Sequence, residues 1–290
     1  MSSNTNRNEL GDFLKARRNE LSPRAVGLPD SSGQRRVTGL RREEVAQLAA
    51  ISTDYYTRLE QGRLPASAPV LTALAEVLHL DEDQRRYLFG LAGKNTAKPR
   101  RRTLQKVQPQ LRRVLDDLTS TPAIVMGRRM DVIAWNPLAA ALITDFGAVP
   151  EKRRNYVRIL FTDPMMRTLY ADWKSVTRMA VAQLRMEAAK YPDDPRLTAL
   201  VGELSVQDAD FRTWWAAHHV AALSVGTKVL NHPVAGELSL DWDTLSASTD
   251  PDQQLVVWTA EVGSPTYDGL RILASWAAGQ YQRTVAGPAD

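Results

Sequence analysis

Cysteine is absent from this 290-residue chain, and so are long apolar runs. Without cysteine the chain can form neither disulfides nor thiolate metal sites, which is consistent with a reducing cytosol. Its first residues lack the apolar segment of a signal peptide, and no stretch approaches the roughly 18 apolar residues that span a membrane. We therefore expect a cytoplasmic (nucleoid-associated) protein that has no membrane partner.

Signals of catalysis are also scarce. The four histidines, His79, His218, His219 and His232, do not have the spacing of a metal site. The chain has no glycine-rich phosphate loop, and residues 263–265 read Gly-Ser-Pro, which is not a nucleophile elbow. We expect no metal, no cofactor and no enzymatic activity.

Charge is distributed unevenly along the chain, whose formal net charge is +4. Residues 1–102 contain 18 Lys and Arg against 12 Asp and Glu, whereas the remainder contains 19 against 21. A basic front part and a near-neutral back part are typical of nucleic-acid binding confined to the front. The break lies in residues 93–102, which lack apolar periodicity and end in three arginines. We expect domains at 1–97 and 109–290 and a basic linker at 98–108, its arginines solvated or, alternatively, tracking phosphates.

Residues 40–63 have the pattern of two short helices joined by a tight turn. The first helix is expected over residues 41–49, with its apolar face formed by Val45, Ala46, Leu48 and Ala49. Ser52 or Thr53 is a candidate N-cap for the second helix because a hydroxyl can accept from a free N–H of the first turn. Gly62 stands where glycine commonly ends a helix. Ala50 occupies a turn position that often holds glycine, and a positive φ there would cost on the order of 1 kcal/mol.

The second helix combines an apolar inner face with a polar outer face. Tyr56 and Leu59 should pack onto the first helix beside the small Ala46. A helix of this kind fits the major groove, where its N-terminal residues reach base edges. The expected base-reading residues are Thr53, Asp54, Tyr55 and Arg58. Arg58 can pair with guanine through two hydrogen bonds, worth roughly 1–3 kcal/mol of discrimination. Contacts with phosphates, which set register without reading sequence, are expected from Arg41, Arg42, Ser52, Thr57, Gln61 and Arg63.

Taken alone, this pattern also fits any pair of amphipathic helices. The intact decapeptide Asp54 to Arg63, DYYTRLEQGR, resembles the second helix of the XRE-type helix-turn-helix family. The resemblance implies a five-helix DNA-binding domain that contacts double-stranded DNA. The remaining helices are expected near 9–20, 69–78 and 81–91. Between the first two helices, residues 22–39 are rich in Gly and Pro and read as a long loop. Near its end, Arg35 and Arg36 either contact the DNA or remain solvated.

The second domain reads as a sheet interrupted by helices, which predicts an α+β fold. A short amphipathic helix with Leu111, Val114, Leu115 and Leu118 opens it. Two strands follow over residues 123–135 and are joined by a turn at Gly127–Arg128, and Asn136–Pro137 starts a helix. Helical periodicity covers residues 169–186 and 211–223. Strands are expected again at 236–242 and 254–261, with a polar turn at 246–253 between them and a final helix at 264–280.

Several segments of this half resemble the PAS-like ligand-binding domain of MmyB-like transcription regulators. They are residues 122–137, 161–173, 193–203, 232–240 and 250–265. The chain departs from the family after Trp215, where Ala217 and then His-His-Val at 218–220 replace an arginine and His-Asp-Val. The resemblance implies a small apolar or fatty-acid-like ligand. The residues compatible with such a ligand are Trp135, Arg167, Tyr170, Trp173, Arg185, Trp214, Trp215 and His218. For any one tryptophan an ordinary core position is the alternative, since large aromatic side chains dominate cores.

The sequence thus predicts a mainly α protein in which a helix-turn-helix domain precedes an α+β domain. The expected function is sequence-specific transcription regulation by a homodimer, because two half-sites multiply the few base contacts that one short helix offers. An effector would act by favouring one arrangement of the two reading helices. Alternatively, the second domain only dimerises or recruits a protein partner, or its pocket serves an enzyme.

Overall fold

The computed structural model describes residues 2–29, 39–93, 105–191, 194–221, 225–247 and 250–286. The chain divides into two compact units that are not sequential. Unit 1 comprises Met1–Arg101, Arg185–Ser205 and Arg212–Ala222, and unit 2 comprises Arg102–Leu184, Val206–Phe211 and Leu223–Asp290. Two segments from the back half of the chain therefore belong to the same compact unit as the front half. The expected sequential limits at 97 and 109 remain a prediction.

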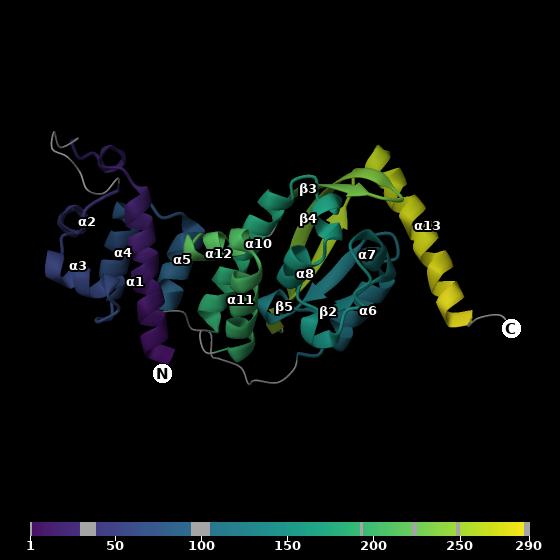
Figure 1. Ribbon diagram of the computed structural model, residues 1–290, viewed down its shortest axis with the longest axis horizontal. Coiled ribbons are helices and arrows are strands. Elements are labelled where there is room, and N and C mark those ends of the chain that lie inside the picture. The colour runs from purple at the N-terminus through teal and green to yellow at the C-terminus, as the bar shows by residue number, and fades with distance from the viewer. Residues whose placement is uncertain are drawn as a thin grey trace. The chain divides into compact units, whose positions relative to one another are not determined.

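Five helices form the front part of unit 1 (Figure 1). They are α1 (Ser2–Glu20), α2 (Arg42–Leu48), α3 (Thr53–Glu60), α4 (Ala68–Val77) and α5 (Glu82–Leu91). Helix α1 begins at Ser2, well before the expected residue 9. Its first turns are polar and have no apolar periodicity, so the sequence pattern did not indicate them. The expected loop at 22–39 contains a 3₁₀ helix, η1 (Pro23–Val26), and residues 30–38 lie outside the described part.

The ends of these helices have identifiable causes. Ser52 caps α3 by accepting a hydrogen bond from the Tyr55 N–H at 3.2 Å. Asp81 caps α5 in a reciprocal box in which its carboxylate accepts from the Gln84 N–H at 2.8 Å. Gly62 follows α3 with a φ of 67°. The interior between the helices is built from buried side chains at helical spacing, among them Leu10, Phe13, Leu14, Leu71, Leu74, Tyr87, Leu88 and Leu91.

Unit 2 contains a five-stranded antiparallel sheet of order β2-β1-β5-β4-β3. The strands are β1 (Ala123–Met126), β2 (Val132–Trp135), β3 (Val225–His232), β4 (Gly236–Ala247) and β5 (Asp250–Thr259). This confirms the α+β class. Strand β3 was not expected from the sequence, and β4 and β5 extend into residues that were assigned to a turn. The turn between β1 and β2 spans Arg128–Asp131. Met130 and Asp131, which were expected to begin the second strand, therefore lie in this turn.

Helices occupy the remainder of the back half. They are α6 (Pro109–Asp117), α7 (Pro137–Leu142), the 3₁₀ helix η3 (Glu151–Arg153), α8 (Tyr156–Thr162), α9 (Met165–Leu169), α10 (Trp173–Lys190), α11 (Pro195–Gln207), α12 (Ala209–Ala216) and α13 (Pro265–Ala286). The expected helix at 169–186 begins only at Trp173, since Leu169 is the last residue of α9, and α12 ends earlier than residue 223. Val114, expected inward on α6, is exposed, whereas Leu115 is buried. The boundary between the units falls inside α10, between Leu184 and Arg185.

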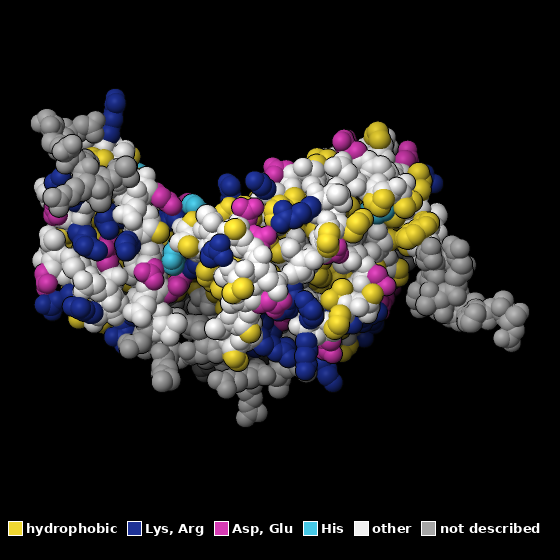
Figure 2. Space-filling model, in the orientation of Figure 1, with side chains coloured by type: hydrophobic (Ala, Val, Ile, Leu, Met, Phe, Trp, Pro, Cys, Tyr) yellow, Lys and Arg dark blue, Asp and Glu magenta, His cyan; other side chains and the backbone are white. Residues whose placement is uncertain are grey.

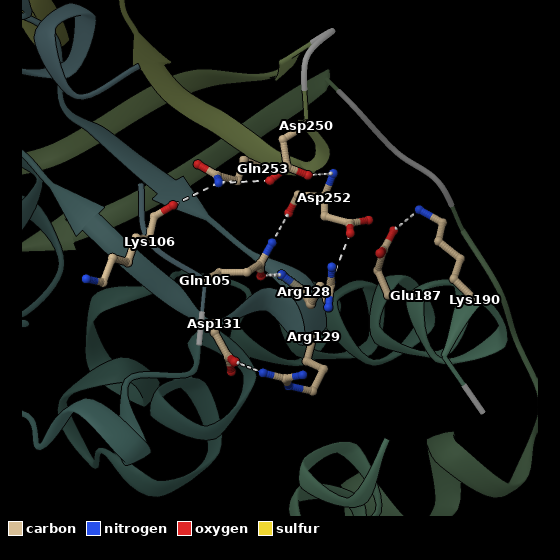
Figure 3. Close-up of polar contacts among 10 residues, drawn as sticks. All are labelled: Gln105, Lys106, Arg128, Arg129, Asp131, Glu187, Lys190, Asp250, Asp252 and Gln253. Carbon is tan, nitrogen blue, oxygen red and sulfur yellow. Dashed lines mark hydrogen bonds and ion pairs between the residues drawn. The ribbon is translucent and has the colours of Figure 1, made fainter. Parts of the chain in front are cut away.

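A polar cluster holds the start of the second domain against the sheet (Figure 3). The Gln105 side chain accepts a hydrogen bond from the Arg128 N–H at 2.6 Å, and the Arg128 guanidinium lies 2.9 Å from the Asp252 carboxylate. The buried Gln253 side chain donates to the Lys106 carbonyl at 3.0 Å. Residues 105–106 are therefore fixed to the β1–β2 turn and to β5.

Candidate nucleic-acid interface

Helices α2 and α3 form the expected pair of helices joined by a tight turn. Tyr56 and Leu59 are fully buried, and Ala46 on α2 is 1 % exposed. Ala50 in the turn has a φ of 51°, so the left-handed conformation anticipated for that position is present without glycine. The inward residues of the motif and its turn are thus confirmed. One expectation is wrong, because Leu48 was placed on the apolar face of α2 but is 38 % exposed.

The outer face of α3 presents polar side chains to solvent. Thr53, Asp54 and Arg58 are exposed, as are Gln61 and Arg63 just beyond the helix. Arg58 and Asp54 form an ion pair at 3.0 Å, with 52 % and 72 % of their side chains exposed. A pair this exposed contributes little to stability. Its partners are therefore free to exchange this contact for one with a base edge.

Tyr55 differs from the other three candidate base-reading residues. It is half-buried against the helical core, and its hydroxyl donates a hydrogen bond to the Pro65 carbonyl at 3.3 Å. Thr57 is also half-buried, and the Ser52 hydroxyl is engaged in capping α3. These residues border the exposed face and help to fix its position.

Glu60, inside the decapeptide, is a buried anion that sequence analysis missed. Its carboxylate forms ion pairs with the guanidinium groups of Arg18 at 2.6 Å and of Arg42 at 2.7 Å. Burial opposes ionisation of Glu60, but the hydrogen bonds from Arg18 and Arg42 outweigh it and hold the pKa of Glu60 below its usual value. Arg42, expected at phosphate, thus also ties α2 to α3. Nothing in the local sequence separates Glu60 from a solvated helix residue.

Basic side chains surround the motif. Arg41 is half-exposed and lies 3.8 Å from Glu43. Figure 2 shows Lys and Arg side chains on the visible face over α2 and α3. Arg35 and Arg36, the other expected phosphate contacts, lie outside the described residues. A positive rim around an exposed helix suits a polyanion, because lysine and arginine release counterions when they neutralise phosphates.

The eight candidate ligand residues fall into separate clusters. In unit 2, the Arg167 guanidinium lies 3.8 Å from the centre of the Trp173 ring and 3.1 Å from Asp208. Trp173 is buried and donates to the Leu160 carbonyl at 2.9 Å. Tyr170 is buried nearby, with its hydroxyl 2.8 Å from that of Tyr156. Burial, followed by the neighbouring Tyr156, raises the pKa of Tyr170, so it stays a neutral phenol.

The other candidates lie elsewhere. The Trp135 ring contacts Phe146, with ring centres 5.5 Å apart, and the Arg154 guanidinium. Arg185, Trp215 and His218 come together in unit 1, where Arg185 is 2 % exposed. Trp214 is half-buried on α12. The candidates therefore do not share one site, because Arg167, Tyr170 and Trp173 lie in unit 2, whereas Arg185, Trp215 and His218 lie in unit 1.

Among the residues that the structure describes, no group of three or more His, Asp or Glu side chains is placed to hold a metal ion. Among the same residues, no helix is long and apolar enough to cross a membrane.

A buried inner face under an exposed polar helix with a basic rim defines a DNA-binding helix-turn-helix protein. Residues 9–88 match the helix-turn-helix domain family, and residues 107–273 match the MmyB-like transcription regulator ligand binding domain. The second match covers more than half of the chain, which therefore belongs to the MmyB-like transcription regulators. No curated protein matches the chain. The protein is a DNA-binding transcription regulator whose second domain is of a ligand-binding family.

Proposed function

We propose that this regulator reads a specific operator through α3 and responds to a small apolar or fatty-acid-like effector held in its second domain. The exposed polar face of α3, set on the buried Tyr56 and Leu59, is the observation that carries the first part. The protein works as a cytoplasmic, nucleoid-associated homodimer and catalyses no reaction.

The base-reading residues of the proposal are Thr53, Asp54, Tyr55 and Arg58. Arg58 supplies a bidentate donor for guanine, and Asp54 can accept from the amino group of cytosine. In the free protein these two exposed side chains pair with each other at 3.0 Å, and each would leave this ion pair to contact a base. Phosphate contacts come from the residues around α3, namely Arg41, Arg42, Ser52, Thr57, Gln61 and Arg63. Arg35 and Arg36 complete this set.

Replacement of Arg58 tests base reading. Arg58→Ala should remove the preference for the selected operator over unrelated duplex, a loss of roughly 1–3 kcal/mol, while weak non-specific binding persists. The operator is first selected from a random pool by the wild-type protein, and both affinities are then measured at one salt concentration.

Arg86→Ala is the matched control for this experiment. Arg86 is 50 % exposed and pairs with Asp83 on α5 at 2.9 Å, as Arg58 pairs with Asp54 on α3. The control should retain full preference. Undiminished preference in Arg58→Ala would show that Arg58 does not read bases.

The homodimer rests on the small size of one reading helix. Helix α3 has 8 residues and offers few base contacts, so two copies on one operator are needed for useful specificity. The selected DNA should contain two related half-sites about 10 base pairs, or a multiple of that, apart from centre to centre. A single unrepeated site would argue for a monomer.

The effector proposal is supported by the ligand-binding family of the second domain and by the cluster of Arg167, Tyr170 and Trp173. Aromatic side chains with few polar groups suit an amphipathic molecule. The alternative is a second domain that only dimerises or recruits a protein. Native mass spectrometry of protein purified from its own host separates them. A stoichiometric lipid-like adduct supports the sensor, an adduct-free dimer supports the alternative, and turnover of a bound compound would indicate an enzyme.

A further inference from the structure

Glu9, on the first helix of the DNA-binding domain, is the centre of a polar cluster that neither family assignment explains. Its carboxylate pairs with the Arg185 guanidinium, accepts a hydrogen bond from the Tyr87 hydroxyl at 2.8 Å and lies 3.2 Å from His218 Nδ1. Arg185 also donates to the Trp215 carbonyl, and its guanidinium lies 4.1 Å from the centre of the Trp215 ring. We name Glu9, Tyr87, Arg185, Trp215 and His218 the Glu9 cluster.

The Glu9 cluster joins two parts of the sequence within unit 1. Glu9 and Tyr87 belong to the helix-turn-helix match at 9–88, whereas the other three residues belong to the ligand-binding match at 107–273. Met186 and Val220 from the same back segments are buried in the core of the five front helices. A second polar contact joins the same parts of the chain, because Arg17 on α1 donates a hydrogen bond to the carbonyl of Ala217, the neighbour of His218, at 3.0 Å.

Packing around the Glu9 cluster leaves room for adjustment. A pocket of about 190 Å³ adjoins it and is lined by Glu9, Tyr87 and Trp215 together with α11 residues such as Leu197 and Val201. Close-packed interiors have few voids larger than a water molecule. This pocket leaves space beside the ion pair into which side chains of the Glu9 cluster can move.

A continuous path of contacts leads from the Glu9 cluster to the reading helix. Gly11 follows Glu9 by two positions on α1. It lies so close to α3 that a Cβ there would be 2.3 Å from the Glu60 carbonyl oxygen. Further along α1, Arg18 binds the Glu60 carboxylate. Helix α1 therefore contacts both the Glu9 cluster and the end of α3.

A second path leads from the Glu9 cluster to the candidate effector residues. Arg185 lies on α10, an 18-residue helix that begins at Trp173 beside Arg167. Arg185 lies twelve positions after Trp173, which corresponds to roughly 18 Å of helix at 1.5 Å per residue. Helix α10 is thus the segment of chain that joins the candidate effector residues to the Glu9 cluster.

We propose that the Glu9 cluster is the coupling element through which the second domain regulates DNA binding. This inference rests on the proposed function, since it concerns how occupancy of the second domain reaches α3. Coupling between two sites is reciprocal, so operator binding must in turn alter the back segments through Glu9. That reciprocity makes the proposal testable with DNA alone, before the effector is identified.

The test is hydrogen exchange of the full-length protein with and without the duplex that the wild type selects from a random pool. In the wild type, operator binding should change exchange of amides in α11 and α12 by about fivefold or more, the range of ordinary allosteric coupling. In Glu9→Gln, which keeps the shape of the side chain but removes its charge, the complex should still form and this change should disappear.

Arg128→Gln is the matched control, because it breaks a partly buried ion pair with Asp252 that lies wholly in unit 2. It should keep the wild-type response to DNA even if its thermal stability falls. Arg185→Lys is the second variant should Glu9→Gln not fold. It retains the charge but not the planar fork, and it should show a reduced response.

Each outcome decides between the proposals. Loss of the α11–α12 response in Glu9→Gln, with its retention in Arg128→Gln, supports coupling through Glu9. An operator complex without any response in the wild type, or with the same response in Glu9→Gln, overturns the coupling and leaves DNA reading intact. If no duplex is preferred by the wild type, the proposed function fails and the coupling fails with it.

Discussion

Individual residues of α3 show which roles can be predicted from a sequence. The inward positions of Tyr56 and Leu59 were predictable because apolar side chains at helical spacing must face a core. Glu60 was not, because its burial depends on Arg18, which lies 42 residues away in the sequence. A local sequence pattern predicts whether a side chain is buried or exposed. It does not reveal which distant residue forms an ion pair with a charged side chain.

Ala50 gives a prediction at the same scale. Its φ of 51° is in the left-handed region, where an L-residue with a Cβ is strained. Ala50→Gly should therefore raise the free energy of unfolding by at most about 1 kcal/mol. Part of this gain is offset because glycine loses more conformational entropy than alanine on folding. Urea unfolding measures this. Gln47→Gly, at an exposed site inside α2, should instead lower stability by about 0.5–1 kcal/mol. Equal effects of both variants would contradict the assignment of strain to Ala50.

At the scale of elements, helices were predicted better than strands. The caps at Ser52 and Asp81 and the glycine at 62 are local signals, and the corresponding helices were expected within a residue or two. Strand β3 was missed because it is a sheet edge whose side chains are mostly exposed. Such a strand lacks the alternation of buried and exposed residues on which prediction relies. Helix α10 was expected to start at residue 169, because the apolar positions continue across residues 170–172, which separate it from α9.

The crossing of α1 and α3 can be tested through two glycines. A Cβ on Gly11 would lie 2.3 Å from the Glu60 carbonyl oxygen, so Gly11→Ala should force the helices apart and lower the free energy of unfolding by about 1–3 kcal/mol. Gly202 lies inside α11, and a Cβ there would meet no atom within 4 Å. Gly202→Ala should therefore stabilise the protein by about 0.5–1 kcal/mol. Thermal unfolding distinguishes the two, and a neutral Gly11→Ala would mean that the crossing yields easily.

At the scale of the whole molecule, the composition of the two units was beyond sequence analysis. The composition shift near residue 100 marks a change of charge and periodicity. It does not predict that Arg185–Ser205 and Arg212–Ala222 belong to the same compact unit as the front half. The pairing of Glu9 with Arg185 joins residues 176 positions apart. Met186 and Val220 have the apolar character of any core residue, and only the folded chain shows whose core they fill. The split of the candidate ligand residues between the units has the same origin.

The Glu9 pairing predicts how the stability of unit 1 depends on pH. Burial raises the pKa of Glu9, but the His218 hydrogen bond and the Arg185 charge outweigh it, and the pKa falls from 4.5 to about 2. Because the folded pKa is lower than the unfolded one, ionised Glu9 stabilises the fold fully above about pH 4.5, and the stabilisation is lost as pH falls toward 2. A shift of this size corresponds to on the order of 3 kcal/mol at neutral pH.

This dependence is measured by comparing urea unfolding of the wild type with that of Glu9→Gln. The variant cannot ionise at this position, so the stability difference should be largest at neutral pH and should shrink by on the order of 2 kcal/mol near pH 3. Arg185, His218 and Tyr87, the other groups facing the carboxylate, are unchanged in the variant. Glu43→Gln, at an exposed glutamate of α2, should match the wild type at neutral pH. A difference between wild type and Glu9→Gln that stayed constant from neutral pH to pH 3 would show that the charge of Glu9 does not stabilise unit 1.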